Sequence, residues 1–124
     1  MNKPTESELE ILRILWANGP SSVRLVNDKI NETKQTGYTT TLKIMQIMAQ
    51  KGLVGRDESS RTHIYEALIK KDSVQSAMLD KLMDTAFGGS ASQLVLNALG
   101  RGDASQKELE EIKALIKKLE GGKL

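Results

Sequence analysis

The chain has 124 residues, of which 39% are hydrophobic, 27% charged and only 3% aromatic, and its formal net charge is +2. This length holds one compact domain, or a small domain with an appendage. The sequence contains no cysteine, which excludes disulfides and thiolate metal sites, and no apolar run approaches the roughly 20 residues that span a bilayer. Because the first ten residues are polar and acidic rather than a signal peptide, we expect a cytoplasmic protein without membrane insertion.

Two short helices are predicted before residue 31. Thr5 and Glu8 form a capping-box pattern that opens the first helix, and an Asn-Gly-Pro sequence at residues 18–20 ends it. Its apolar positions are Leu9, Leu12, Leu15 and Trp16. Ser21 or Ser22 caps the second helix. The apolar residues of that helix, at helical spacing, are Val23, Val26 and Ile30.

A third helix is predicted after Gly37, with Thr39 as its N-cap and Gly52 as its end. We expect Ile44, Met45 and Met48 to face the core with Thr41 at its edge, while Leu42 and Ile47 fit either local packing or contact with a thymine methyl. The residues then left toward solvent are Thr39, Thr40, Lys43, Gln46 and Gln50. Residues 33–56 contain four basic side chains and no acidic one, which suits a helix that lies against phosphates.

The next segment has the pattern of a β-hairpin. Residues 53–56 and 61–65 flank a polar turn at residues 57–60. Three short helices followed by a hairpin predict a winged helix-turn-helix, and the alternative is another kind of small α+β domain. Arg61 and His63 lie where a wing would meet a nucleic-acid backbone.

The exposed polar residues of the third helix suit double-stranded DNA. Thr hydroxyls and free amides at a helix start can bind phosphate, whereas Gln and Lys can read adenine and guanine edges. The alternative is that these residues are merely solvated. His63 is the only histidine, and no nucleophile–base pair, phosphate loop or metal-ligand cluster is visible. We therefore expect no catalytic residue, no metal and no cofactor.

Residues 71–124 are predicted to form three further helices. The first is capped by Asp72 or Ser73 and ends at Ala86, the second spans residues 91–99, and the third opens with a capping box from Ser105 to Glu108. Their apolar faces exceed what three short elements can hide among themselves, so burial against a second copy is expected. Folding back onto the first domain is the alternative. The residues expected in the homodimer contact are Met78, Leu82, Leu94, Leu109, Ile112, Leu115 and Ile116.

The fold class expected is therefore mostly α with a small β-hairpin. A winged helix-turn-helix DNA-binding domain would cover residues 1–70, and a C-terminal helical dimerisation region would cover residues 71–124. Residues 1–70 carry ten basic and eight acidic side chains, against eight of each in the remainder, so the excess positive charge lies in the first part.

Several motifs of this chain resemble those of the penicillinase repressor family, the BlaI/MecI/CopY group. They are Leu15-Trp16, Gly19-Pro20, Tyr38-Thr39-Thr40, Lys51-Gly52-Leu53-Val54 and Phe87-Gly88-Gly89-Ser90. The resemblance covers about residues 5–120. It implies a homodimeric repressor that binds dyad-symmetric operators. In the penicillinase branch it further implies a membrane sensor that detects β-lactams and leads to cleavage of the repressor in its dimerisation helices.

Two departures from the family pattern bear on regulation. The copper-responsive branch uses a C-terminal cysteine cluster, which this chain lacks, so copper sensing is not expected. In the antibiotic-resistance repressors of this family, the cut falls after an Asn that is followed by a Phe. The matching position here is the bond between Asn97 and Ala98, where alanine replaces the aromatic residue.

Three functions are compatible with these features. The leading one is a dimeric transcriptional repressor that reads a pseudo-palindromic operator with the helix at about 39–51 and the wing at about 53–66. A winged-helix protein–protein interaction module is the second. The third is a regulator that binds an effector in a pocket lined by the C-terminal aliphatic residues.

Overall fold

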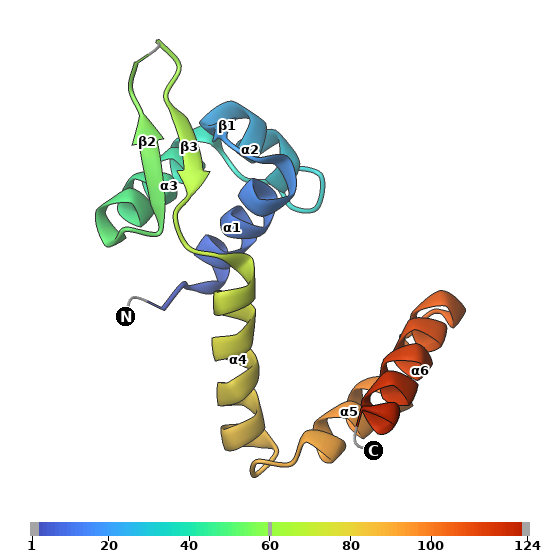
Figure 1. Ribbon diagram of the computed structural model, residues 1–124. Coiled ribbons are helices and arrows are strands. Elements are labelled where there is room, and N and C mark those ends of the chain that lie inside the picture. The colour runs from blue at the N-terminus through green and yellow to red at the C-terminus, as the bar shows by residue number, and fades with distance from the viewer. Residues whose placement is uncertain (1–2, 60, 123–124) are drawn as a thin grey trace. The chain divides into compact units, whose positions relative to one another are not determined.

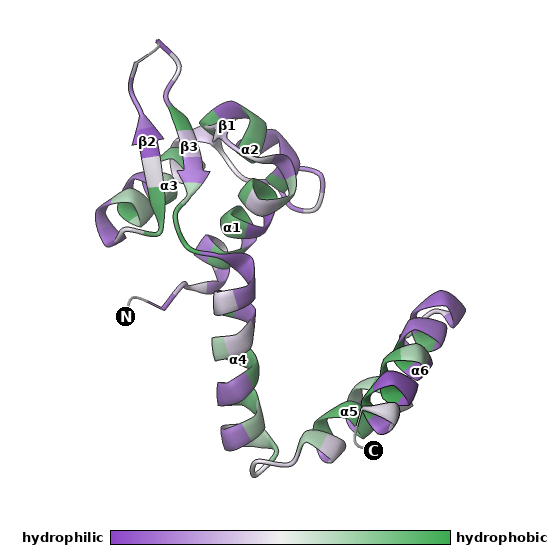
Figure 2. Ribbon diagram, in the orientation of Figure 1, coloured by the Kyte–Doolittle hydropathy of each residue, from purple (hydrophilic) through white to green (hydrophobic). Residues whose placement is uncertain are grey.

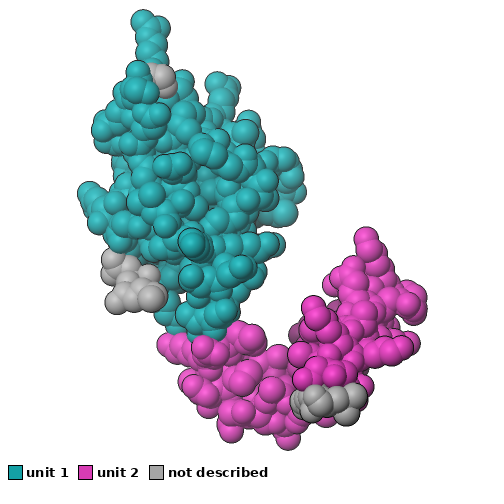
Figure 3. All heavy atoms as spheres, in the orientation of Figure 1, with its two compact units in different colours: residues 1–77 teal, residues 78–124 magenta. Residues whose placement is uncertain are grey.

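The computed structural model describes residues 3–59 and 61–122. The chain divides into two compact units, residues 1–77 and residues 78–124 (Figure 3). Helices dominate both units, and a small antiparallel sheet lies in the first (Figure 1). This confirms the fold class expected from the sequence, a winged-helix arrangement followed by C-terminal helices.

The first unit contains a three-stranded sheet rather than a two-stranded hairpin. Its elements are α1 (Glu6–Asn18), β1 (Ser21–Ser22), α2 (Val23–Ile30), α3 (Tyr38–Lys51), β2 (Val54–Asp57), β3 (Ile64–Ala67) and the start of α4 (Lys71–Ala86). The strand order is β1-β3-β2, and both pairings are antiparallel. Ser21 pairs with Tyr65 in this sheet, so the short segment before α2 is both a strand and, through Ser22, a helix cap. Ser60, in the expected turn between β2 and β3, lies outside the described residues.

The core of the first unit is aliphatic and rich in methionine. α1, α2, α3 and the sheet all contribute to it. The fully or almost fully buried residues are Ile11, Leu12, Leu15, Val23, Val26, Ile30, Met45, Met48, Leu53, Val54 and Tyr65. Leu9 is only half-buried and Ile11 takes the core position in its place. Thr41, expected at the core edge, is fully buried.

Both ends of α1 follow the local signals in the sequence. The Thr5 side chain accepts a hydrogen bond from the Glu8 amide at 3.2 Å, and the Glu8 carboxylate accepts one from the Thr5 amide at 2.9 Å. This reciprocal pair satisfies two amides that the helix leaves without partners. At the other end, Gly19 adopts a positive φ of 77°, which glycine tolerates without steric cost.

The start of α3 differs from the sequence prediction. The helix begins at Tyr38 with Gly37 as the N-cap residue and no side-chain cap, so Thr39 lies in the first turn. In the preceding loop, the Asn31 side chain accepts a hydrogen bond from the Thr36 amide and donates one to the Thr36 carbonyl. These two bonds fix the backbone at Thr36, and the helix begins two residues later, at Tyr38. The Thr39 hydroxyl is left exposed.

The second unit contains the end of α4, together with α5 (Ala91–Gly100) and α6 (Gln106–Gly121). Ser90 caps α5, and Ser105 and Glu108 form the expected capping box at the start of α6. α4 itself begins at Lys71, so Asp72 lies in its first turn instead of capping it. Within the described ranges, no helix is both long and apolar enough to cross a membrane.

Apolar side chains of the second unit remain open to solvent. Figure 2 shows hydrophobic residues along α5 and α6, interspersed with polar ones. α5 and α6 contain no fully buried residue. The exposed large hydrophobic side chains of this unit are Met78, Leu79, Leu82, Val95, Leu96, Leu115, Ile116 and Leu119. Leu94, Leu109 and Ile112 are half-buried.

Candidate nucleic-acid interface

One face of α3 is polar, exposed and free of carboxylates. All five residues proposed from the sequence to contact DNA from this helix are exposed, namely Thr39, Thr40, Lys43, Gln46 and Gln50. The opposite face buries Thr41, Met45 and Met48 in the core. α3 therefore presents hydroxyl, amide and ammonium groups to solvent from a rigidly packed helix, and these groups can bind phosphates and base edges.

Side-chain hydrogen bonds hold the first turn of α3. The Asn27 amide donates to the Thr41 hydroxyl at 2.8 Å and to the Thr36 carbonyl at 3.1 Å. Asn27 belongs to α2, so this one side chain connects α2, the α2–α3 loop and α3. The packing of α3 against α2 therefore includes a polar contact as well as the apolar core.

An ion pair holds the last turn of α3. The Lys51 ammonium lies 2.8 and 3.0 Å from the two carboxylate oxygens of Glu8, a residue that is only 4% exposed. Burial opposes ionisation of Glu8, but the hydrogen bonds from Lys51 and Thr5 outweigh it and lower the pKa of this carboxyl. The capping box of α1 is thus joined to the C-terminal end of α3.

A hollow of about 380 Å³ lies where α3 meets the wing, which is the β2–β3 hairpin. Of the residues proposed from the sequence, it brings together Gln46, Arg61 and His63. Thr39, Thr40, Lys43 and Gln50 do not line it. Its other lining residues were not among the proposed site residues, and they include Arg24, Tyr38 and Arg56.

The signals for these missed residues differ. Arg56 belongs to the acid-free stretch and could have been proposed on its charge. Arg24 carries no local signal, because its place beside the wing depends on the pairing of β1 with β3. Tyr38 is an exposed aromatic residue at the start of α3.

Cationic groups dominate the hollow. No carboxylate is found among the described residues that line it, whereas Arg24, Arg56 and Arg61 all contribute to its wall. The nearby Tyr65 oxygen, and then Glu58, raise the pKa of the Arg56 guanidinium, which stays protonated. The Tyr65 hydroxyl is buried and completes no hydrogen bond of good geometry within the described residues. This concave, positively charged surface suits a phosphodiester backbone.

The start of the wing turn is negatively charged. Asp57 accepts a hydrogen bond from the Ser59 amide at 2.9 Å. Hydrogen bonding to Ser59 lowers the pKa of the Asp57 carboxyl, which keeps it ionised. Glu58 lies beside it and pairs with Arg56 at 3.0 Å. Two carboxylates disfavour contact of this turn with DNA, so the side chains at the base of the wing are better placed to meet phosphates.

Two lysines of the acid-free stretch are paired with carboxylates of α1. Lys51 pairs with Glu8, and Lys34 pairs with Glu10 at 3.1 Å. Their charges are therefore partly neutralised by residues far away in the sequence. Lys43 has no ion pair or hydrogen-bonding partner for its side chain among residues 3–59 and 61–122. Of the two lysines of α3, it is the one whose ammonium is available to an anionic ligand.

The remaining proposed residues lie in α4, α5 and α6. Met78, Leu82, Leu115 and Ile116 are exposed. Asn97 and Ala98 are exposed within α5, where the Asn97 amide donates to the Gln93 carbonyl at 2.8 Å. In the part of the chain that the structure describes, no group of three or more His, Cys, Asp or Glu residues is placed to hold a metal ion.

Comparison with known proteins gives the chain its family. The family model described as penicillinase repressor matches residues 4–118. The methicillin resistance regulatory protein MecI of Staphylococcus aureus (strain N315) is 22% identical over 114 residues, which cover 92% of this chain and 93% of that protein. A penicillinase repressor of Staphylococcus aureus is 23% identical over 118 residues, covering 93% and 94%. The transcriptional regulator BlaI of Mycobacterium tuberculosis (strain ATCC 25618 / H37Rv) is 27% identical over 114 residues, covering 86% and 83%. With a match over nearly its whole length, the chain belongs to the penicillinase repressor family of transcriptional repressors.

Proposed function

We propose that this protein is a dimeric transcriptional repressor that binds a pseudo-palindromic operator in double-stranded DNA. The observation that carries the proposal is the joint surface of α3 and the wing base. It presents Lys43, Gln46 and Arg61 together with the arginine-lined hollow, and no carboxylate lines that hollow. Family membership supports the same function, since the related proteins are named as repressors and regulators.

Within this surface, different residues have different tasks. Lys43 and Gln46 lie on the exposed face of α3 and are suited to base edges in the major groove. Thr39 and Thr40 lie in the first turn, where hydroxyl and amide groups suit a phosphate. Arg61 and His63 extend the contact to the backbone beside the wing, and Gln50 marks the far end of the reading helix.

Dimerisation would occur through residues of α4, α5 and α6. The support is the exposure of apolar side chains such as Leu82, Leu115 and Ile116, together with the half-buried Leu94, Leu109 and Ile112. Each aliphatic side chain removed from water contributes about 1.5–3 kcal/mol. A twofold dimer would place two α3 helices on one duplex, with half-sites separated by a multiple of roughly 10–10.5 base pairs.

Release from DNA would follow cleavage between Asn97 and Ala98. Both residues are exposed in α5. A cut there would separate α6 from the rest of the dimerisation region and weaken self-association, and two linked half-site contacts bind far more tightly than separate ones. The cut would be triggered by a membrane sensor that acts through a protease pathway.

Binding-site selection with the full-length chain tests the central proposal. Random duplexes would be enriched on the purified protein, and the recovered sites measured by gel shift. The expected result is a palindromic consensus bound with a specificity ratio of about 10³ or more over random duplex. If no sequence is enriched and the protein still binds a protein partner, the protein–protein interaction module would be favoured instead.

A further inference from the structure

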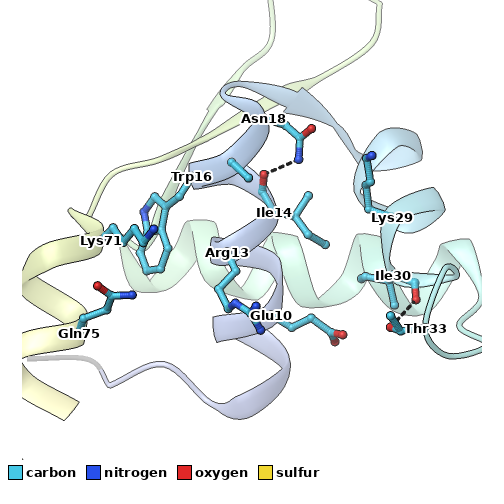
Figure 4. Close-up of a pocket in the computed structure, with 11 residues that line it drawn as sticks. Glu10, Arg13, Ile14, Trp16, Asn18, Lys29, Ile30, Thr33, Lys71 and Gln75 are labelled. Atoms are coloured by element: carbon cyan, nitrogen blue, oxygen red, sulfur yellow. Dashed lines mark hydrogen bonds between the residues drawn. The ribbon is translucent and has the colours of Figure 1, made fainter. Parts of the chain in front are cut away.

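A second groove crosses the outer face of α1 in the first unit, away from the residues of the candidate interface. Its volume is about 490 Å³, and it shares no lining residue with the hollow beside the wing. Figure 4 shows α1 between the start of α4, which carries Lys71 and Gln75, and α2, which carries Lys29 and Ile30. Three separate elements thus contribute walls to one groove.

The floor of the groove is apolar and partly rigid. Ile14 and Ala17 contribute aliphatic surface from α1. On the side of α1 that faces α4 lies the half-buried indole of Trp16 (Figure 4), whose N–H donates to the Ile69 carbonyl at 3.0 Å. Because this bond fixes the ring against the segment that leads into α4, Trp16 offers a flat apolar surface of defined orientation.

The rim of the groove carries an excess of positive charge. Arg13, Lys29 and Lys71 line it, one each from α1, α2 and α4. Among the described residues that line it, one is a carboxylate, Glu10, which pairs with Lys34 at 3.1 Å. Lys29 has a weak contact with Glu32 at 3.7 Å. The side chains of Arg13 and Lys71 make no hydrogen bond or ion pair with any other described residue.

We infer that this groove binds a small organic anion with an apolar body and two anionic groups, carboxylate or phosphate. The volume lies within the roughly 300–1,000 Å³ typical of small-molecule sites, and such sites combine apolar walls with a few polar groups. The apolar body would rest on the indole of Trp16, beside Lys71 (Figure 4). The anionic groups would pair with the guanidinium of Arg13 and the ammonium of Lys71, which lack partners within the described chain.

Such a ligand would act on α4. It would connect Arg13 of α1 to Lys71 in the first turn of α4, and α4 continues past residue 77 into the second unit. This step rests on the proposed repressor function. Ligand binding would stabilise one orientation of the start of α4 and would thereby change the affinity of the protein for its operator. This groove is distinct from the pocket of the effector-binding alternative, which would be lined by C-terminal aliphatic residues.

The single tryptophan makes the site directly observable. The full-length chain, without DNA, would be titrated with heptanedioate, nonanedioate and hexane-1,6-diyl bisphosphate at constant ionic strength, with heptanediamide as the uncharged control. Trp16 fluorescence and the indole N–H cross-peak in an ¹⁵N NMR spectrum report binding. We expect a saturable response to at least one of these anions, with a dissociation constant of about 1 mM or tighter, and none to the diamide.

Variants identify the groups involved. Arg13→Gln and Lys71→Gln should each weaken the response about fivefold, which is the loss of one exposed charge pair. Lys107→Gln in α6 is the matched control and should leave it unchanged. No saturable response from any of the three anions up to about 10 mM would overturn the inference, as would a response that both groove variants retain in full. The anion titration contains no DNA, so a negative titration would not contradict the proposed operator binding. Failure of the binding-site selection would likewise leave the result of the anion titration unchanged.

Discussion

The ion pair between Glu8 and Lys51 permits a quantitative prediction, because the chain contains a matched exposed pair. Glu8→Gln keeps the side-chain size and can still accept from the Thr5 amide, but it removes the charge that Lys51 faces at 2.8 Å. Removing one partner of a fully buried pair costs roughly 3–5 kcal/mol. The Lys51 side chain is 32% exposed and can regain water, so we expect a loss of about 1–2 kcal/mol.

Urea unfolding monitored by Trp16 fluorescence measures this loss, since the only tryptophan lies in the first unit. Glu10→Gln is the control. It breaks a pair of similar length, at 3.1 Å, whose side chains are 30% and 55% exposed. An ion pair with this much exposure contributes about 0–1 kcal/mol to the free energy of unfolding. A double-mutant cycle of Glu8→Gln with Lys51→Met isolates the coupling between the two side chains.

The same pair predicts a dependence on pH. The pKa of Glu8 is lowered from an ordinary value of 4.5, so the folded state binds the Glu8 proton more weakly than the unfolded state does. Its contribution to stability is therefore fully present above about pH 4.5 and is lost as the pH falls through the lower folded-state pKa. The stability difference between wild type and Glu8→Gln should shrink over that range. The reasoning fails if the difference is unchanged by acid, or if Glu10→Gln costs as much as Glu8→Gln.

Four further outcomes are expected. Asn27→Ala should lower the free energy of unfolding in urea by about 1–3 kcal/mol, because it leaves the buried Thr41 hydroxyl of α3 without its donor, and it should weaken operator binding. Wild-type stability together with wild-type operator affinity would contradict the role given to this side chain. Arg61→Ala should lower affinity for all duplexes alike and should reduce the slope of log binding constant against log salt concentration by roughly 1. Gln46→Ala should instead change the preference among bases by roughly 1–3 kcal/mol. If Gln46→Ala and the wild type select the same sites, Gln46 does not read bases. Ile116→Glu should shift the chain toward monomer in sedimentation, and an unshifted dimer would move the contact elsewhere. Mass spectrometry of protein recovered from cells before and after β-lactam exposure should reveal a fragment ending at Asn97; an intact chain with the target genes induced would eliminate cleavage as the switch.

The sequence alone was sufficient for the features that depend on neighbours within about four residues. Both capping boxes, at Thr5 and at Ser105, form the hydrogen bonds that their spacing predicts. The sequence also predicted that α1 and α3 end at glycine and that α5 starts after Ser90. Such ends can be predicted locally, because a capping residue bonds to the backbone of its own helix. The order of these elements was sufficient to predict the fold class, and the motifs were sufficient to indicate the family.

The tertiary structure decided the features that join distant segments. The third strand forms only because Ser21 lies beside Tyr65, and that pairing places Arg24 next to the wing. The acid-free stretch suggested four available cations, yet folding brings the carboxylates of α1 to Lys34 and Lys51. A charge pattern along the chain does not determine the electrostatic potential of a surface, because ionic partners are chosen by packing and can lie 43 residues apart, as Glu8 and Lys51 do.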